Sequence, residues 1–188
     1  MVYKGSRLTP ETSDEFRNAV DLGPSRTLQQ DIEFGILQIV DIALKAISPA
    51  VNDPSTAITC VDHLSRILIR FASRESAAHL FYDPPSVLRV SIDWTDFDHL
   101  LGTAFEQIRM YAKGDTAVSL RLLRALGDIA TTTPDTKFRK AIHERGKRIV
   151  EGCAEKLGEE DLRSLRVRLS ALERLSVVSS GVAEAQER

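Results

Sequence analysis

The chain has no run of about 18 consecutive apolar residues, the length that a helix needs to cross a bilayer. Residues 1–4 (MVYK) also lack the apolar stretch of a signal peptide. Only two cysteines occur, Cys60 and Cys153, and they lie far apart without the CxxC spacing of redox or metal motifs. Both fall on apolar faces of predicted helices, which is typical of buried thiols in a reducing compartment. We therefore expect a soluble cytoplasmic protein.

The sequence is also poor in the patterns of catalytic and metal sites. Its four histidines form no His-x3-His or His-Glu-x2-His pattern, so zinc binding is not predicted. Gly102, Gly114 and Gly127 stand singly and form no phosphate-binding loop. Ser48 lies in no Gly-x-Ser-x-Gly elbow. We therefore expect no metal, no cofactor and no catalytic residue, and a role other than catalysis is favoured.

Neither sign of charge dominates, because 25 Lys and Arg residues stand against 27 Asp and Glu residues. No global field therefore recruits nucleic acid, and the aromatic interleaving of single-strand binding proteins is absent, so no nucleic-acid partner is expected. The apolar content of 43% and the charged content of 28% are globular values. A chain of 188 residues can bury one substantial core.

What the sequence does contain is helical periodicity, with apolar residues three and four positions apart. Gly, Pro or capping residues bound four such segments, over residues 11–22, 25–47, 54–74 and 134–157. A capping box at Thr95 and a polar turn ending at Asp115 predict two more helix starts, and Thr133-Pro134 predicts the start of the 134–157 helix. After Gly158, a last helix places five leucines in one seam, which we expect to be core rather than a dimer interface: Leu162, Leu165, Leu169, Leu172 and Leu175.

These patterns predict an all-α helical bundle of about seven helices with one inserted β-hairpin. We expect residues 1–178 to form one domain with a lead-in over 1–10, and residues 179–188 to be a frayed tail. The hairpin covers residues 79–92, where two apolar stretches flank a proline turn. Because two strands alone are only marginally stable, we expect the hairpin to lie on the helices.

Residues 47–57 (ISPAVNDPSTA) are the most informative stretch of the chain. Pro49 disfavours helical geometry at Ser48, so the incoming helix should end near Ile47. Asp53 followed by Pro54 is typical of an N-cap and a first helical position. The turn exposes several polar side chains at one place, and another lies one to two turns before it: Asp41, Ser48, Asn52, Asp53 and Thr56.

Two interpretations of these polar residues are open. They can form a pocket for a cation or a small polar ligand, since hard cations prefer oxygen ligands. Alternatively they are structural, with Asp53 as a cap and Asp62 paired to Arg66 four residues on. Asp31 and Asp41 then lie on a solvated helix stripe.

The 134–157 helix has an unusual charge distribution. Positive charge near a helix N-terminus opposes the macrodipole, yet the part of this helix that precedes its acidic end carries six basic residues: Lys137, Arg139, Lys140, Arg145, Lys147 and Arg148. One interpretation is a patch that faces anionic lipid headgroups or an acidic partner. The other is a solvated face whose ionic partners come from neighbouring helices.

Several short motifs occur together in the first third of the chain: Arg26-Thr27, Asp31, Phe34-Gly35, residues 40–44 (VDIAL) and residues 46–57. Together they resemble the soluble region of a bacterial membrane-protein family known as domain of unknown function 2254. That family's pattern runs loosely as R-T, Q-D-x-x-F-G, V-D-I-A-L-x-A-L-S-P and N-D-P-T-T-A. The match is strongest over residues 26–64, with Ile47 in place of the usual Leu and Ser55 in place of the usual Thr.

The resemblance implies attachment to a bacterial inner membrane, with the membrane-spanning region of the parent protein as a partner. Family members carry several predicted spanning helices ahead of this region, so we expect an excised domain or a truncated product. It implies no activity. We therefore expect a non-catalytic cytoplasmic regulatory or assembly domain at the cytoplasmic face of the membrane, with a homo-oligomer possible. The alternative is a sensor that binds a small ligand or cation at the Ser48–Thr56 loop.

Overall fold

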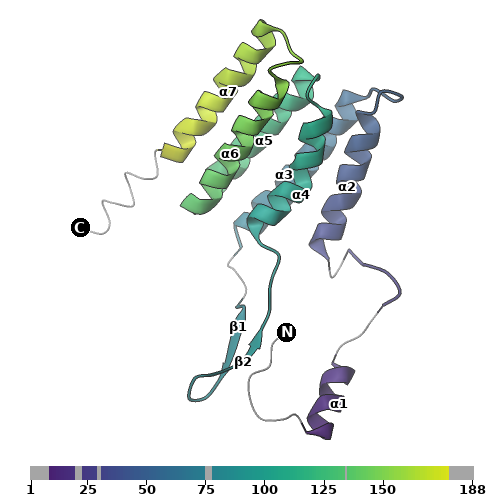
Figure 1. Ribbon diagram of the computed structural model, residues 1–188, viewed down its shortest axis with the longest axis vertical. Helices are drawn as coiled ribbons and strands as arrows, with labels where there is room; N and C mark the ends of the chain where they lie inside the picture. The colour runs from purple at the N-terminus through teal and green to yellow at the C-terminus, as the bar shows by residue number, and fades with distance from the viewer. Residues whose placement is uncertain (1–8, 20–22, 29–30, 75–77, 134, 178–188) are drawn as a thin grey trace, which may run out of the picture.

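The computed structural model describes residues 9–19, 23–28, 31–74, 78–133 and 135–177 (Figure 1). Within these ranges it contains seven helices and one antiparallel hairpin, which confirms the predicted all-α bundle with an inserted hairpin. The elements are α1 (Pro10–Asn18), α2 (Ile32–Ala46), α3 (Pro54–Ala72), β1 (Leu80–Asp83), β2 (Val87–Ser91), α4 (Phe97–Tyr111), α5 (Thr116–Thr132), α6 (Thr136–Cys153) and α7 (Glu159–Val177). The predicted frayed tail and residues 1–8 of the lead-in lie outside the described residues.

Aspartates set the start of most of these helices. An aspartate side chain accepts a hydrogen bond from a backbone N–H of the first turn in five helices, at Asp31, Asp53, Asp96, Asp115 and Asp135. Each bond satisfies a donor that has no partner within the helix. The predicted starts at Asp53 and Asp115 are therefore confirmed.

Two other predicted caps are wrong by one or two residues. The N-cap of α4 is Asp96 rather than Thr95, because the Asp96 carboxylate accepts from the His99 amide at 2.7 Å. The N-cap of α6 is Asp135, and Thr133 instead ends α5. A carboxylate one or two residues after each threonine provides the stronger, charged acceptor at the positive end of the helix.

Four helices are shorter than predicted, α3 by only two residues, since it ends at Ala72. Helix α2 begins at Ile32 rather than at residue 25, because the backbone of Asp31 is extended and its side chain caps Phe34. Helix α6 ends at Cys153, and the chain then forms a turn instead of remaining helical to Leu157. Helix α1 covers Pro10–Asn18, and residues 20–22 of its predicted span lie outside the described residues.

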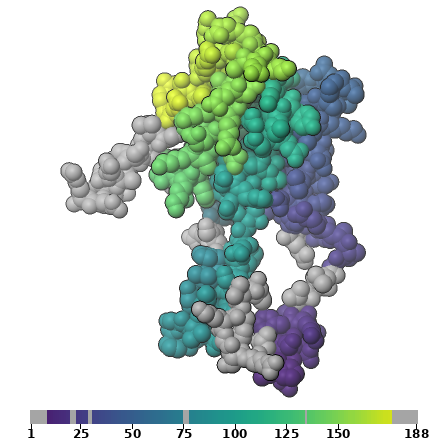
Figure 2. Space-filling model, in the orientation of Figure 1, coloured from purple at the N-terminus to yellow at the C-terminus, as the bar shows by residue number. Residues whose placement is uncertain are grey.

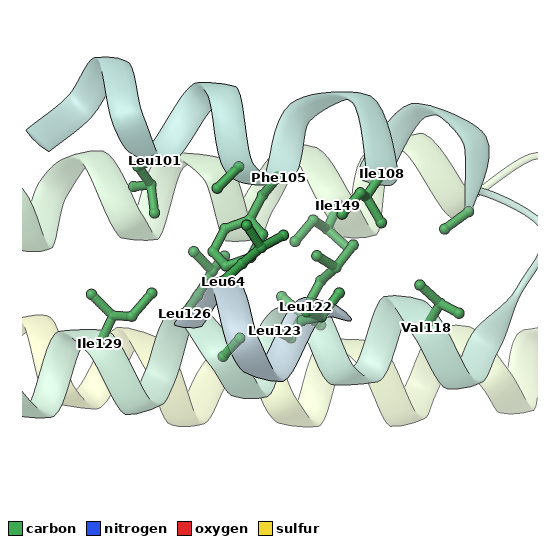
Figure 3. Packing of buried hydrophobic residues seen from close by; sticks show 14 of the residues in the cluster. Leu64, Leu101, Phe105, Ile108, Val118, Leu122, Leu123, Leu126, Ile129 and Ile149 are labelled. Carbon is green, nitrogen blue, oxygen red and sulfur yellow. The ribbon is translucent and has the colours of Figure 1, made fainter. Parts of the chain in front are cut away.

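The core lies among α2 to α7, where each helix buries one apolar face against its neighbours (Figure 3). Helix α5 is central and packs against α3, α6 and α7, whereas α2 is at one edge and packs against α3 and α4 (Figure 1). Burying one large aliphatic side chain contributes about 1.5–3 kcal/mol. The predicted leucine seam of α7 belongs to this core for most of its length, since Leu162, Leu165 and Leu172 are buried and Leu169 packs against them, whereas Leu175 is 37% exposed at the end of the helix.

The hairpin extends away from this bundle (Figures 1 and 2). Its strands pair with each other, with Leu80 opposite Ser91 and Phe81 opposite Val90, and among the described residues neither strand packs against a helix to a comparable extent. The prediction that the hairpin lies on the helices is therefore wrong. The base of the hairpin stays paired where the chain leaves the bundle, since the Ile92 amide donates to the His79 carbonyl at 2.9 Å, and the two strands form beyond that point.

Candidate functional site

The loop between α2 and α3 is closed by its own backbone. The Val51 and Asn52 amides donate to the Ser48 carbonyl at 3.0 and 2.9 Å, and the Asp53 amide donates to the Ala46 carbonyl at 2.8 Å. Asn52 has a φ of 48°, in the left-handed region that asparagine tolerates better than most residues. This residue therefore provides the change of direction that lets α3 begin immediately after α2.

Two of the predicted ligand-binding residues form the N-cap of α3. The Asp53 carboxylate accepts from the Thr56 hydroxyl at 2.5 Å and from the Thr56 amide at 3.1 Å. The hydroxyl bond, and then the amide bond, hold the pKa of Asp53 below its ordinary range. The prediction that Asp53 caps α3 is confirmed, and both of its carboxylate oxygens already have partners.

The other three predicted ligand-binding residues lie apart from this pair. The Ser48 hydroxyl donates to the Lys45 carbonyl at 2.7 Å, while Asp41 lies on the exposed face of α2. The side chains of Asp41 and Asn52 make no hydrogen bond or ion pair with any described residue. Across the described ranges, no cluster of three or more His, Cys, Asp or Glu side chains is arranged to hold a metal ion. Ligand binding by these five residues remains a prediction.

Two predicted ionic roles are corrected by the packing of the helices. Asp62 pairs with Arg121 of α5 instead of Arg66, because α3 packs against α5 along this face. Asp31 precedes α2 as its cap, rather than lying on a solvated stripe, and its carboxylate is 2.5 Å from the Arg26 guanidinium. The guanidinium bond is the main cause that lowers the pKa of Asp31.

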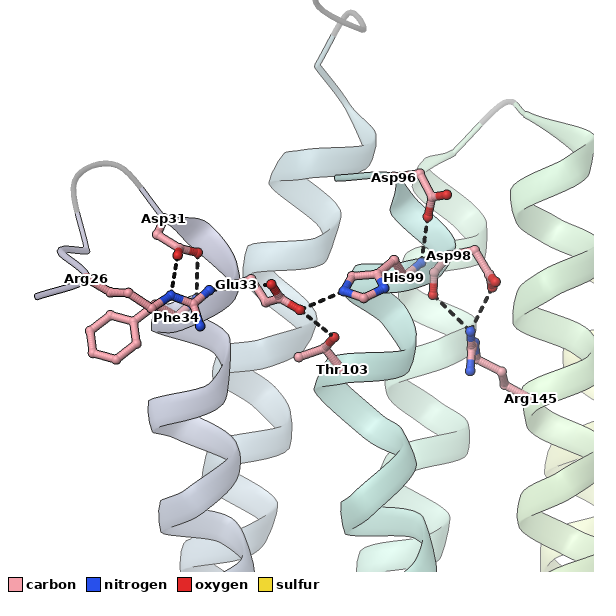
Figure 4. A network of polar contacts seen from close by, with 9 residues as sticks. All are labelled: Arg26, Asp31, Glu33, Phe34, Asp96, Asp98, His99, Thr103 and Arg145. Carbon is pink, nitrogen blue, oxygen red and sulfur yellow. Dashed lines mark hydrogen bonds and ion pairs between the residues drawn. The ribbon is translucent and has the colours of Figure 1, made fainter. Parts of the chain in front are cut away.

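Arg26 brings together residues from three of the short motifs that carry the family resemblance (Figure 4). Its guanidinium bonds Asp31, lies 3.5 Å from Glu33 and is 5.5 Å from the centre of the Phe34 ring. Leu28 lies over Gly35, where an added Cβ would be 3.3 Å from the leucine Cδ2. These contacts show that the segment before α2 folds back on the first turn of the helix, which explains why the motif residues lie five to eight positions apart.

A polar network joins α2 to α4, and sequence reasoning missed it (Figure 4). The Glu33 carboxylate lies 2.6 Å from His99 Nε2 and accepts from the Thr103 hydroxyl at 3.4 Å. The bond to His99 is the largest cause that lowers the pKa of Glu33. No local signal could have identified this contact, because His99 follows Glu33 by 66 residues. The network ties two helices together at the end of the bundle that carries the hairpin.

The six basic residues of α6 divide into two groups. Arg139 donates to the Thr133 carbonyl at 2.8 Å, Arg145 bonds Asp98 of α4, and Lys147 lies 3.0 Å from Glu144. The other three are exposed: Lys137, Lys140 and Arg148. A patch that contacts lipid or a partner therefore rests on these three, and that role remains a prediction.

An open groove of about 470 Å³ lies along α5 and α7. It is lined by Leu120, Arg163, Ser164, Val167, Arg168, Ala171 and Arg174. Its lining contains three arginines and no carboxylate, imidazole or thiol, so it offers no general base. Sequence reasoning missed it, because the groove exists only where α5 and α7 pack together.

Comparison with known proteins places this architecture in a family. Residues 1–128 match the family DUF2254, described as a predicted membrane protein, which confirms the resemblance. The chain is 36% identical over 146 residues to uncharacterised proteins of Mycobacterium bovis and of two Mycobacterium tuberculosis strains, which covers 78% of this chain and 28% of each relative. No solved structure matches the chain. None of the described helices is long and apolar enough to span a membrane.

Proposed function

Since this chain belongs to the DUF2254 family of predicted membrane proteins, we propose that it is a non-catalytic regulatory or assembly domain of a bacterial membrane protein. It lies at the cytoplasmic face with the hairpin end of the bundle toward the membrane. The relatives are longer proteins of which this chain matches 28%, so it acts together with further parts of such a protein.

The observation that carries the proposal is the uncovered hairpin. Its exposed apolar residues are Phe81, Tyr82 and Val87, and the tryptophan that follows it, Trp94, is 55% exposed. The Trp94 indole donates to the Ala78 carbonyl at 3.0 Å and closes the base of the hairpin. Tyrosine and tryptophan are the residues that favour the membrane interface. An isolated hairpin is marginally stable, so contact with a second surface would stabilise it.

Two exposed basic residues of α6 support the same orientation. The Phe97 and Phe138 rings stack with their centres 4.4 Å apart, so the first turn of α6 lies beside the first turn of α4. Helix α4 directly follows the hairpin, which places Lys137 and Lys140 at the hairpin end of the bundle (Figure 1). Each lysine near an anionic leaflet contributes about 1 kcal/mol of attraction.

Trp94 gives a direct test because it is the single tryptophan of the chain. Adding anionic phosphatidylglycerol vesicles at low salt should shift its fluorescence to the blue, and high salt should reverse the shift because it screens the lysines. The double variant Lys137→Glu/Lys140→Glu should lose the shift. Substituting Met110, which is 52% exposed at the far end of α4, with serine should leave it intact.

Neutral phosphatidylcholine vesicles are the second control. They should give little or no shift, because the aromatic residues alone bind weakly without the lysines. An equal shift with neutral and anionic vesicles would contradict the electrostatic part of the proposal. No shift with either at low salt would contradict the orientation itself.

A further inference from the structure

The groove along α5 and α7 continues into a second hollow of about 400 Å³, and both hollows are lined by Arg168 and Ala171. We call the two together the α5–α7 groove. Short turns join α5 to α6 and α6 to α7, so that α5 and α7 run parallel and pack side by side (Figure 1). From Leu120 on α5 and from Ser164 on α7, lining residues recur at intervals of four, three and four. Two such rows form the kind of groove that accepts a third helix.

Part of the lining of this groove is apolar or small. Val167 is 65% exposed and Leu175 is 37% exposed, so both have apolar surface that a partner can cover. A Cβ on Gly127 would meet no atom within 4 Å, which leaves open space over this part of α5. Together with Ala171, this glycine lets a docked helix approach closely.

The charge of the groove is mostly of one sign. Its lining contains one carboxylate, that of Asp128. The same lining contains four arginines, all of them exposed: Arg124, Arg163, Arg168 and Arg174. None of the four forms a hydrogen bond or an ion pair with a described residue. Arg163 follows Glu159 by four residues, the spacing of a helical ion pair, yet Glu159 bonds Arg166 instead at 2.8 Å. The groove therefore offers unpaired positive charge, although the whole chain has a net charge of −2.

The arrangement of these arginines selects an elongated occupant. Arg163 and Arg174 are separated by about 16 Å along the axis of α7, so the arginines are distributed along the groove rather than gathered round one phosphate-sized point. The lining contains no aromatic side chain on which a nucleic-acid base could stack. An acidic amphipathic helix matches the row, because its carboxylates recur every three or four residues and its apolar stripe can cover Val167 and Leu175.

We propose that an acidic amphipathic helix of a partner protein docks in the α5–α7 groove. Its carboxylates bind the four arginines through charge-assisted hydrogen bonds, and Arg168 is central because it lines both hollows. Its apolar stripe covers Val167 and Leu175. The groove shares no residue with the hairpin, and the docking does not depend on the proposed membrane contact.

Fluorescence anisotropy with the full chain tests the docking. The probe is a fluorescein-labelled synthetic helix of about three heptads, with leucine at the first and fourth positions of each heptad and glutamate beside them. It should bind at low salt and more weakly as salt is raised, because salt screens the exposed arginines. The same peptide with lysine in place of glutamate should not bind. A peptide that keeps the glutamates and has serine in place of each leucine should bind at least about tenfold more weakly.

Three variants of the chain separate charge from shape. Arg168→Glu should raise the Kd for the acidic peptide at least about tenfold, because it reverses the charge at the centre of the groove. The matched control is Arg148→Glu, since Arg148 is exposed on α6, lines neither hollow and undergoes the same change of charge. Gly127→Leu should raise the Kd severalfold with no change of charge, because the leucine would occupy the open space over α5. Thermal melts of the three variants should show no loss of stability, which separates loss of docking from loss of folding.

Several outcomes of these measurements would overturn the proposal. They are an acidic peptide that does not bind at low salt, a wild-type Kd for Arg168→Glu, and an equal loss of binding for Arg148→Glu. Displacement of the peptide by millimolar pyrophosphate at constant ionic strength would indicate a phosphate site in place of a helix site.

Discussion

The helical bundle and the hairpin of this protein differ in what stabilises them. In the bundle, α2 to α7 share one continuous core that includes Leu122 and Leu126 at no more than 1% exposure. In the hairpin, Phe81 and Tyr82 are 43% and 58% exposed, and the ladder between the strands supplies most of the contacts. The comparison shows that the fold is determined by the bundle, whereas the hairpin is a surface feature available to a partner.

The largest expected effect comes from the centre of the bundle. Leu122→Ala should lower the free energy of unfolding by about 2–5 kcal/mol, because it removes a fully buried side chain and leaves a cavity. Urea denaturation followed by circular dichroism measures the loss. A change below that of a typical surface substitution would mean that α5 is not the centre of the core.

A smaller loss is expected where Gly146 lets α6 pack closely on α7. A Cβ on Gly146 of α6 would lie 2.8 Å from Leu172 Cδ2 and 3.1 Å from Leu169 Cδ1. Gly146→Ala should therefore cost about 1–3 kcal/mol through overpacking. The matched control is Gly127→Ala in α5, where a Cβ would meet no atom within 4 Å. That control should be neutral or stabilising by up to about 1 kcal/mol, because alanine favours the helix.

The cap of α3 should have a moderate effect that depends on pH. Asp53→Ala should lower the melting temperature at pH 7 by about 2–4 °C, while Asp53→Asn, which keeps an acceptor, should lose less. Because the folded pKa of Asp53 is depressed, the stabilisation by its carboxylate is present above the unfolded pKa and is lost as pH falls through the folded pKa. The wild type and Asp53→Ala should therefore converge in melts at low pH. A gap that stays constant down to the lowest pH would exclude the charged cap as its cause.

The smallest effect on stability is expected in the hairpin. Phe81→Ser combined with Tyr82→Ser should change the unfolding free energy of the bundle by no more than about 0.5 kcal/mol, since both side chains are exposed. The same variant should weaken the Trp94 response to anionic vesicles. A large loss of stability here would show that the hairpin packs on the bundle after all and would remove the contrast between the two regions.

Part of the candidate site followed from the sequence, since Asp53-Pro54 identified the cap and Pro49 the end of α2. The cluster around Arg26 was present in the motif, yet its contacts to Asp31 and Phe34 require the three-dimensional turn before α2. The Glu33–His99 contact had no sequence signal at all.

The sequence alone determined the helices, because each is encoded by apolar residues three and four positions apart and most have a cap within one turn of their start. It also predicted that the α7 leucines face the core, because about seven helices have apolar faces to bury against one another, and three of the five leucines are buried. Tertiary structure decided which faces meet. Asp62 pairs with Arg121 rather than Arg66, and α2 is at the edge of the bundle, because helix packing depends on residues far apart in the chain. The hairpin extends away from the bundle for the same reason. The local pattern specifies its two strands, but whether the strands pack on the helices depends on which helix faces remain open once the bundle has formed.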